Sequence, residues 1–458
     1  MDIGSTLPIW SIIPFVGMLL CIAILPLTKF ATWWEHHQLH VALFWSLVFL
    51  IPFTFAYGIE ETGYELMESV VLDYIPFIVL LLGLFVVAGN IHIAGTRPGT
   101  TRNNVILLTI GTVLASWVGT TGAAMLLIRP VLRANAWRQH KTHVIIFFIF
   151  LVANMGGCLT PLGDPPLFLG FLRGVPFLWT MEHIWPILLM NTIILLVVFA
   201  LIDHHYIKKE GKEGLEALEL GRKAMEHTHI HIEGIHNILF LGIIILAVIL
   251  NGIIPQMDTF LDESGQVIGI DVCEGIHLGI NYFLQLILIL AAAAASWFTT
   301  KPELREKNHF EWAPITEVAK LFIGIFITMI PALALLRTNG GALGIDSPAK
   351  FFWITGALSS FLDNSPTYVV FLTTAGALGA TSGVVTTVGT VAPGILLAIS
   401  AGAVFMGAIT YIGNAPNFMV KNMAERSGIK MPSFFKYMGW SCGILIPLFI
   451  LDTLVFFL

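Results

Sequence analysis

Residues 156–170 read "GGCLTPLGDPPLFLG" and place three prolines and one carboxylate inside an apolar part of the chain. The apolar residues 147–153 precede this stretch. Proline removes a backbone hydrogen-bond donor and interrupts a helix, and glycine weakens one. The stretch therefore predicts a helix that is broken in its middle and carries an acid, Asp164, at the break.

The composition indicates a membrane protein. Of the 458 residues, 56% are hydrophobic and only 11% are charged. A soluble domain carries roughly 25% charged residues, so this chain cannot cover a water-facing surface. Apolar segments near the roughly 20 residues needed to span a bilayer recur along the chain. The expected spans, besides the broken helix, are 9–27, 41–56, 74–94, 184–201, 238–254, 283–297, 320–335, 396–412 and 438–458.

Several classes of function are excluded by missing motifs. The chain has no Walker motif, no GxSxG elbow and no HExxH, so we expect neither ATP drive nor an enzyme. Its four cysteines lack metal spacing, so we expect no disulfide framework, no transition-metal site and no cofactor. The amino-terminal residues lack a basic region, so the first span is expected to be retained. Nothing points to nucleic acid.

Loop charges predict the orientation, because cytoplasmic loops are enriched in Lys and Arg. Basic residues gather in 129–141, 208–223, 301–307 and 421–436, and acidic residues in 60–68 and 258–274. We expect the basic loops in the cytoplasm, and the acidic loops and both termini outside. In a bacterium, the membrane would be the inner, cytoplasmic membrane.

Two further apolar segments do not fit as simple spans. Segment 104–128 has basic residues on both sides, and segment 351–375 fits with both ends outside. Each is predicted to be a re-entrant hairpin, surrounded by protein or by a water-filled cavity. The expected fold is all-α and polytopic, with about ten transmembrane helices plus two hairpins.

The two halves of the chain match each other. GCLTPLGDPPLF (157–168) aligns with GAITYIGNAPNF (407–418), and SWVGTTGAAMLLI (116–128) aligns with SFLDNSPTYVVFL (360–372). The first alignment places Asp164 opposite Asn414. Because the halves start on opposite sides of the membrane, the repeats are inverted. Inverted repeats with broken helices are the best sequence indication of a secondary transporter with a midplane site.

These alignments divide the chain into three parts. The first inverted repeat covers 1–203, with its hairpin at about 104–128 and its broken helix at about 143–175. A cytoplasmic charged, His-rich loop covers 204–235. The second repeat covers 236–458, with its hairpin at about 351–375 and its broken helix at about 395–420.

The motifs FLDNSPT (361–367) and LTPLGDPPLF (159–168) resemble those of the ion transporter superfamily, and most closely its NhaD-like sodium/proton antiporters. The superfamily also includes divalent anion/sodium symporters, arsenite permeases and the melanosomal P protein. The resemblance implies a homodimer with a scaffold domain and a moving transport domain that gives alternating access. The tip of the first hairpin departs from the antiporter pattern and reads Gly-Thr-Thr at 119–121.

The resemblance also implies the site residues. By position, Asp363, Asn364 and Ser365 match the second hairpin tip, and Asp164 matches the acid of the first broken helix. Sodium is a hard ion and prefers oxygen ligands. Further candidate ligands on the paired motifs are Thr120, Thr121, Thr160, Thr367, Thr410 and Asn414. Asp164 and Asp363 are expected to alternate between Na⁺ and H⁺.

Other polar residues each fit two roles, one in function and one in structure. His92 is a candidate for tuning the pH response, because its side chain titrates near neutrality, and it also fits as an interfacial histidine. The stretch 227–236 could bind a metal or sense pH, or it could be a solvated loop. Ser116, Asn154 and Asn417 are expected to support the site or to pack between helices.

The leading interpretation is an antiporter that exchanges Na⁺ (or Li⁺) for H⁺. The alternative is a sodium-coupled symporter of a carboxylate or oxyanion, because helix amino termini can hold an anion without arginine.

Overall fold

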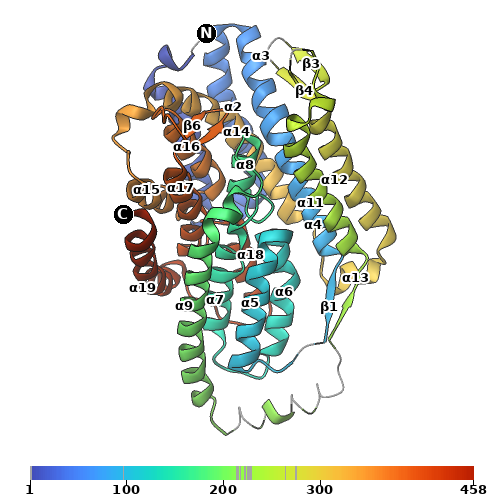
Figure 1. Cartoon of the computed structure of the whole chain (residues 1–458). Helices are drawn as coiled ribbons and strands as arrows, with labels where there is room; N and C mark the ends of the chain where they lie inside the picture. Colours follow the sequence, from blue (N-terminus) through green and yellow to red (C-terminus); the bar gives the residue numbers. More distant parts are fainter. Residues whose placement is uncertain are drawn as a thin grey trace.

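The computed structural model describes residues 3–95, 97–212, 216, 218–220, 223, 230–263, 265–273 and 276–458, and within them the structure is mainly helical (Figure 1). Eight helices in this part of the chain are long and apolar enough to cross a membrane. They are Ile9–Leu27, Ala31–Tyr57, Ile59–Gly89, Trp179–Lys209, Asn237–Gln256, Ile280–Thr299, Ala313–Leu343 and Phe434–Phe457. The prediction of an all-α polytopic membrane protein is confirmed.

Helix α2 (Ala31–Tyr57) illustrates why these helices suit lipid. Its residues Leu43, Leu47 and Ile51 follow one another at four-residue spacing and therefore lie on one face. They are 48%, 52% and 53% exposed. A large exposed apolar patch is rare on a soluble monomer, and it marks a surface that contacts a membrane or another protein.

Two sets of helices form the framework of the molecule. The first set, at the right of Figure 1, is α4 (Ile75–Gly89), α11 (Asn237–Ile253) and α12 (Ile280–Thr299). The second set is α1 (Ile13–Ile24), α2 and α14 (Ala313–Asn339). The rings of Phe77 on α4 and Phe322 on α14 stack with centroids 4.7 Å apart, which joins the two sets.

Two helix pairs occupy the segments predicted as hairpins. The first pair is α5 (Thr101–Val118) and α6 (Thr120–Ala134), and the second is α15 (Pro348–Ser359) and α16 (Asn364–Gly376). Only Gly119 joins α5 to α6, at φ 80°, a backbone conformation that favours glycine. Helix α6 packs against α4, and α16 packs against α14.

Two broken helices cross the interior. The first is α7 (Thr142–Leu151), a 3₁₀ turn η5 (Met155–Cys158) and α8 (Pro165–Leu172). The second is α17 (Pro393–Phe405), a 3₁₀ turn η9 (Met406–Ile409) and α18 (Ala415–Arg426). Helix α8 packs against α16, and α18 packs against α6, so each broken helix contacts the helix pair of the other half.

The remaining elements complete the two halves and their ends. Helix α9 (Trp179–Lys209) follows the first broken helix, and α19 (Phe434–Asp452) with the π-helix η10 (Thr453–Phe457) follows the second. Shorter helices are α3 (Ile59–Met67), the π-helix η4 (Glu68–Tyr74) and α13 (Pro302–Lys307). The antiparallel strand pairs are β1 (His92–Ala94) with β2 (His231–Glu233), β3 (Gly269–Cys273) with β4 (Ile276–Gly279), and β5 (Val384–Thr386) with β6 (Gly389–Val391).

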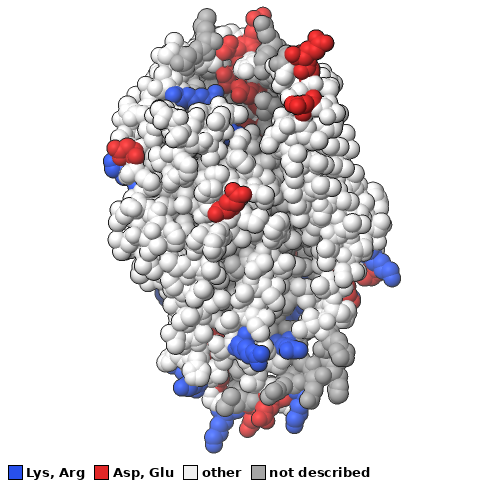
Figure 2. Space-filling model, viewed as in Figure 1, with Lys and Arg blue, Asp and Glu red and all other residues white. Residues whose placement is uncertain are grey.

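Charged side chains gather at the two ends of the molecule in Figure 2, with few between them. In this view acidic side chains dominate the upper end, where α3 and the β3–β4 pair lie in Figure 1. Most visible Lys and Arg side chains lie at the lower end. This separation is consistent with the predicted orientation, in which the basic end faces the cytoplasm.

Candidate ion site

The two breaks share one backbone hydrogen-bonding scheme. The hydroxyl of Thr160 donates to the backbone oxygen of Ser116, and the hydroxyl of Thr410 donates to the backbone oxygen of Ser360. Each threonine oxygen also accepts from a backbone N–H two residues later, at 3.2 Å in both breaks. Each threonine therefore ties its break to the helix pair of its own half and satisfies backbone groups that the break leaves without helical partners.

Glycines let the chain fold closely on itself at each break. A β-carbon at Gly163 would collide with the backbone oxygen of Gly157, and one at Gly413 would collide with that of Gly407. The glycines that the sequence pairs therefore have the same steric role. Proline follows at the start of each outgoing helix, where the missing N–H costs no hydrogen bond.

Asp164 lies at the centre of the site and is 0% exposed. Its Oδ1 accepts hydrogen bonds from Thr120 Oγ1 at 3.0 Å and from Asn414 Nδ2 at 3.1 Å. Its Oδ2 accepts from Asn364 Nδ2 at 2.7 Å. The three donors come from both helix pairs and from the second break, so the carboxyl group joins the two halves of the chain.

Four helices start at the members of this network. Thr120 is the first residue of α6, and Asn364 is the first residue of α16. Asp164 precedes α8 and Asn414 precedes α18. A helix amino terminus carries a partial positive charge, so four such ends converge on one carboxyl group. Such ends favour a negative charge on this group whenever it is ionised.

Basic side chains do not contribute to the network. In the part of the chain that the structure describes, no Lys or Arg side chain forms an ion pair or hydrogen bond with Asp164 or Asp363. Arg173, which directly follows α8, instead forms an ion pair with Asp73, with its guanidinium nitrogen 2.8 Å from Asp73 Oδ2. The donors to Asp164 are all neutral.

Asp363 lies next to this network, and its side chain binds its own helix. Its Oδ1 accepts from the backbone N–H of Ser365 at 2.9 Å, so Asp363 is the amino-terminal cap of α16. The hydroxyl of Thr367 donates to the backbone oxygen of Asp363 at 2.9 Å. Asn364 follows Asp363 directly and links this tip to Asp164.

The structure separates the predicted site residues into two groups. Thr120, Asn364 and Asn414 bind the carboxyl group of Asp164 directly. The other hydroxyls do not reach it: Thr160 and Thr410 bind backbone oxygens, Thr367 binds the backbone of its own helix, and Ser365 Oγ lies 3.4 Å from Asn364 Oδ1. The hydroxyl of Thr121 makes no hydrogen bond to another described residue.

Two buried amides, those of Asn154 and Asn417, connect the second break to the network around Asp164. Asn417 Nδ2 donates to the backbone oxygens of Gly407 at 2.8 Å and Thr410 at 2.9 Å. Asn154 Nδ2 donates to Asn417 Oδ1 at 2.7 Å, and Asn154 Oδ1 accepts from Asn414 Nδ2 at 3.3 Å. Both amides lie next to a break in the sequence, and this position is the sequence signal for a role in the site. An amide next to a break is equally typical of packing between membrane helices, so the sequence leaves both roles open.

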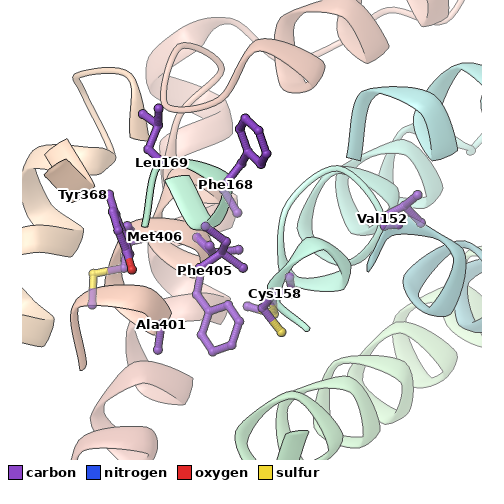
Figure 3. Packing of buried hydrophobic residues seen from close by; sticks show 14 of the residues in the cluster. Val152, Cys158, Phe168, Leu169, Tyr368, Ala401, Phe405 and Met406 are labelled. Carbon is purple, nitrogen blue, oxygen red and sulfur yellow. The ribbon is translucent and has the colours of Figure 1, made fainter. Parts of the chain in front are cut away.

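Apolar side chains surround the breaks (Figure 3). Phe168 and Leu169 extend from α8, and Phe405 and Met406 come from the junction of α17 and η9. All four are at most 1% exposed. This packing keeps water away from the polar network, which strengthens the interactions inside it.

The histidines singled out from the sequence lie away from this site. His92 is on β1, and its Nδ1 lies 2.8 Å from Asn308 Oδ1. The amide nitrogen of Asn308 donates to two backbone oxygens, so its Oδ1 is the acceptor and His92 Nδ1 is the donor. Of the stretch 227–236, residues 227–229 lie outside the described residues, and 231–233 form β2. Among described residues no His, Cys, Asp or Glu cluster fits a metal.

The comparison with protein families gives one match over nearly the whole chain. A family described as "Putative citrate transport" matches residues 4–457. A search of the curated proteins finds no match to the chain.

Proposed function

The chain belongs to this citrate-transport family, and we propose that it is a secondary active transporter that exchanges Na⁺ or Li⁺ for H⁺ at Asp164. One observation carries the proposal: the fully buried carboxyl group of Asp164 receives three neutral donors and four helix amino termini, and no basic side chain among the described residues binds it. Helix ends allow the group to ionise, while burial makes a lone charge costly. The group is therefore suited to hold either a proton or a cation.

The amides next to Asp164 suit both occupants. Asn364 and Asn414 present N–H groups to the carboxylate. A carboxamide also carries an oxygen acceptor, and rotation of the amide would turn that oxygen towards a hard cation. Thr120 supplies a hydroxyl oxygen in the same place. In this proposal Asp363, Ser365 and Thr367 shape the tip of the second helix pair, and Thr160 and Thr410 hold the breaks open.

The proposal includes the arrangement expected from the sequence. The helix pairs and broken helices of the two inverted repeats, 1–203 and 236–458, form a transport domain, and its motion against the scaffold domain exposes the site on alternate sides. The protein acts as a homodimer with both termini outside. His92 and the stretch 227–236 do not take part in ion binding in this scheme.

The test uses purified protein in liposomes that contain a pH-sensitive dye. After a proton gradient is imposed, Na⁺, Li⁺ or K⁺ is added. We expect Na⁺ or Li⁺ to dissipate the gradient, and we expect this response to disappear in Asp164→Asn. Asp346→Asn, at an exposed acid paired with Lys350, is the matched control and should respond like the wild type. A protein that responds to no cation would refute the exchange.

The second candidate is sodium-coupled symport of a carboxylate, and the family description favours it. The converging amino termini of α6, α8, α16 and α18 could hold a carboxylate group of a substrate without arginine. Labelled citrate should then accumulate in the same liposomes only when Na⁺ is present outside. Uptake without dissipation of the proton gradient by Na⁺ alone would select symport over exchange.

A further inference from the structure

A second buried carboxyl group lies outside both breaks. Asp452 ends α19 and Asn191 lies in α9, and both residues are 0% exposed. Asn191 Nδ2 donates to Asp452 Oδ2 at 2.9 Å. Both residues belong to helices that are long and apolar enough to cross the membrane. An acid inside such a span is costly and is a functional candidate by default.

The two side chains leave two buried oxygens without a partner. Asp452 Oδ1 and Asn191 Oδ1 make no hydrogen bond to any described residue. Both oxygens are acceptors when Asp452 is ionised, so neither can satisfy the other. A single proton on Asp452 Oδ1 removes the buried charge and supplies the missing donor. The carboxyl and amide groups would then exchange two hydrogen bonds.

The pair also repeats a feature of the Asp164 site. Residues 186–192 read PILLMNT and residues 447–453 read PLFILDT, which share the pattern Pro-x₄-[Asn/Asp]-Thr. The offset is 447 − 186 = 261 for the prolines and 452 − 191 = 261 for the polar pair. Asp164 and Asn414 likewise occupy matching positions and contact each other. In both pairs one half supplies the acid and the other half supplies the amide.

Because each pair joins matching residues of the two halves, the Asp164–Asn414 pair and the Asp452–Asn191 pair should both lie near the symmetry axis that relates the halves. Matching residues of two inverted repeats contact each other only near the pseudo-two-fold axis that relates the repeats. The acid comes from the first half at the Asp164 pair and from the second half at the Asp452 pair. The number of donors differs, since Asp164 receives three hydrogen bonds and Asp452 receives one.

No charged neighbour accounts for Asp452. Within the described residues, only Asn191 forms a hydrogen bond with its side chain. The next residue, Thr453, accepts from Trp353 Nε1 on α15 at 2.9 Å. The other titratable side chains on α9, α19 and the elements packed against them form no hydrogen bond or ion pair with the pair. They are Arg102, His143, Cys158, Glu182, His183, Asp203, His204, His205, Tyr206, Lys208, Lys209, Lys350, Lys436, Tyr437 and Cys442.

We propose that Asp452 and Asn191 form a second proton-binding site, in which protonated Asp452 donates to Asn191 Oδ1 and accepts from Asn191 Nδ2. The site is separate from the cation exchange proposed for Asp164 and does not depend on it. Its ligand is the proton, because two side chains provide too few oxygens for a hard cation, which takes about six.

Infrared absorption of the purified wild-type protein and of Asp452→Asn at neutral pH tests the site. We expect the difference spectrum to contain the C=O stretch of a protonated carboxyl group, shifted in D₂O. Asp346→Asn, at an exposed acid paired with Lys350 at 2.7 Å, is the control and should remove only carboxylate bands. A difference spectrum of Asp452→Asn with carboxylate bands alone would overturn the proposal.

A second variant tests the role of Asn191 as the partner of Asp452. It also provides a test if Asp452→Asn does not fold. Asn191→Leu removes both hydrogen bonds from the protonated group, so its C=O band should move to the higher frequency of an unbonded acid. An unchanged band would refute the pairing. The melting temperature gives a third reading. It should fall as the pH rises above the range in which a free aspartate ionises, because the unfolded chain then releases a proton that folded Asp452 retains, and it should fall less in Asp452→Asn. An equal fall in both would contradict a buried, protonated Asp452.

Discussion

The first break, 157–168, and the second break, 407–418, have the same backbone arrangement and different polar groups. In each, a threonine binds the backbone oxygen of a serine at the end of the first helix of the preceding pair, and two glycines approach closely. Asp164 precedes the outgoing helix of the first break, and Asn414 precedes that of the second. The amide of Asn414 donates to the carboxyl group of Asp164.

The difference shows how a duplicated backbone can produce a single buried ionisable group. Two facing carboxylates would repel each other or share a proton. An acid facing an amide keeps one ionisable group and gives it a neutral donor. The shared backbone therefore provides the geometry, and the Asp/Asn difference provides the chemistry.

The largest expected effect comes from making the two breaks alike. Asp164→Asn removes the only carboxyl group of the matched pair Asp164 and Asn414, so exchange of Na⁺ for H⁺ in liposomes should fall to the level of empty liposomes. The fold should survive, because an amide fits the same space. Persistent exchange in a folded variant would show that Asp363 or another acid carries the ion.

Swapping the side chains of Asp164 and Asn414 gives a sharper test. In Asp164→Asn/Asn414→Asp the acid moves to the second break and keeps its amide partner. We expect exchange above that of Asp164→Asn but below the wild type, because Thr120 and Asn364 bind the acid only at its original position. Recovery to the full wild-type rate would mean that these two donors contribute nothing.

Removing the shared hydrogen bond should destabilise both breaks, and more so at Thr410, whose hydroxyl also accepts from the backbone N–H of Gly413 at 3.1 Å. Thr160→Val and Thr410→Val each leave a buried backbone oxygen without its donor, which should lower the free energy of unfolding by about 1–3 kcal/mol. Thermal unfolding of the two purified variants provides the measurement. No loss in either one of the variants would contradict a shared role for the two threonines.

The smallest effect is expected at the tip of the first helix pair. Thr121 makes no hydrogen bond through its hydroxyl to another described residue, so Thr121→Ala should change the free energy of unfolding by less than about 0.5 kcal/mol. Thr120→Ala is the matched control, and it should slow exchange because it removes a donor to Asp164. Equal loss of exchange in both variants would place Thr121 in the site as well.

Local sequence signals predicted the helices and several residues of the polar network around Asp164. Apolar length indicated the spans, and prolines with glycines located the breaks, because both act through the nearest few residues. The matched motifs singled out Asp164, Thr120, Asn364 and Asn414, which do lie together. The same reasoning gave every hydroxyl in those motifs the same role, although Thr160 and Thr410 bind backbone oxygens.

The sequence by itself determined a membrane protein with two similar halves, each with a break and a polar tip. Only the tertiary structure decided which polar groups meet. Asn364 lies 200 residues from Asp164, and Asp452 lies 261 residues from Asn191, so neither contact follows from local preference. Such contacts depend on how whole helices pack, and here α8 against α16 and α18 against α6 bring both halves to one carboxyl group.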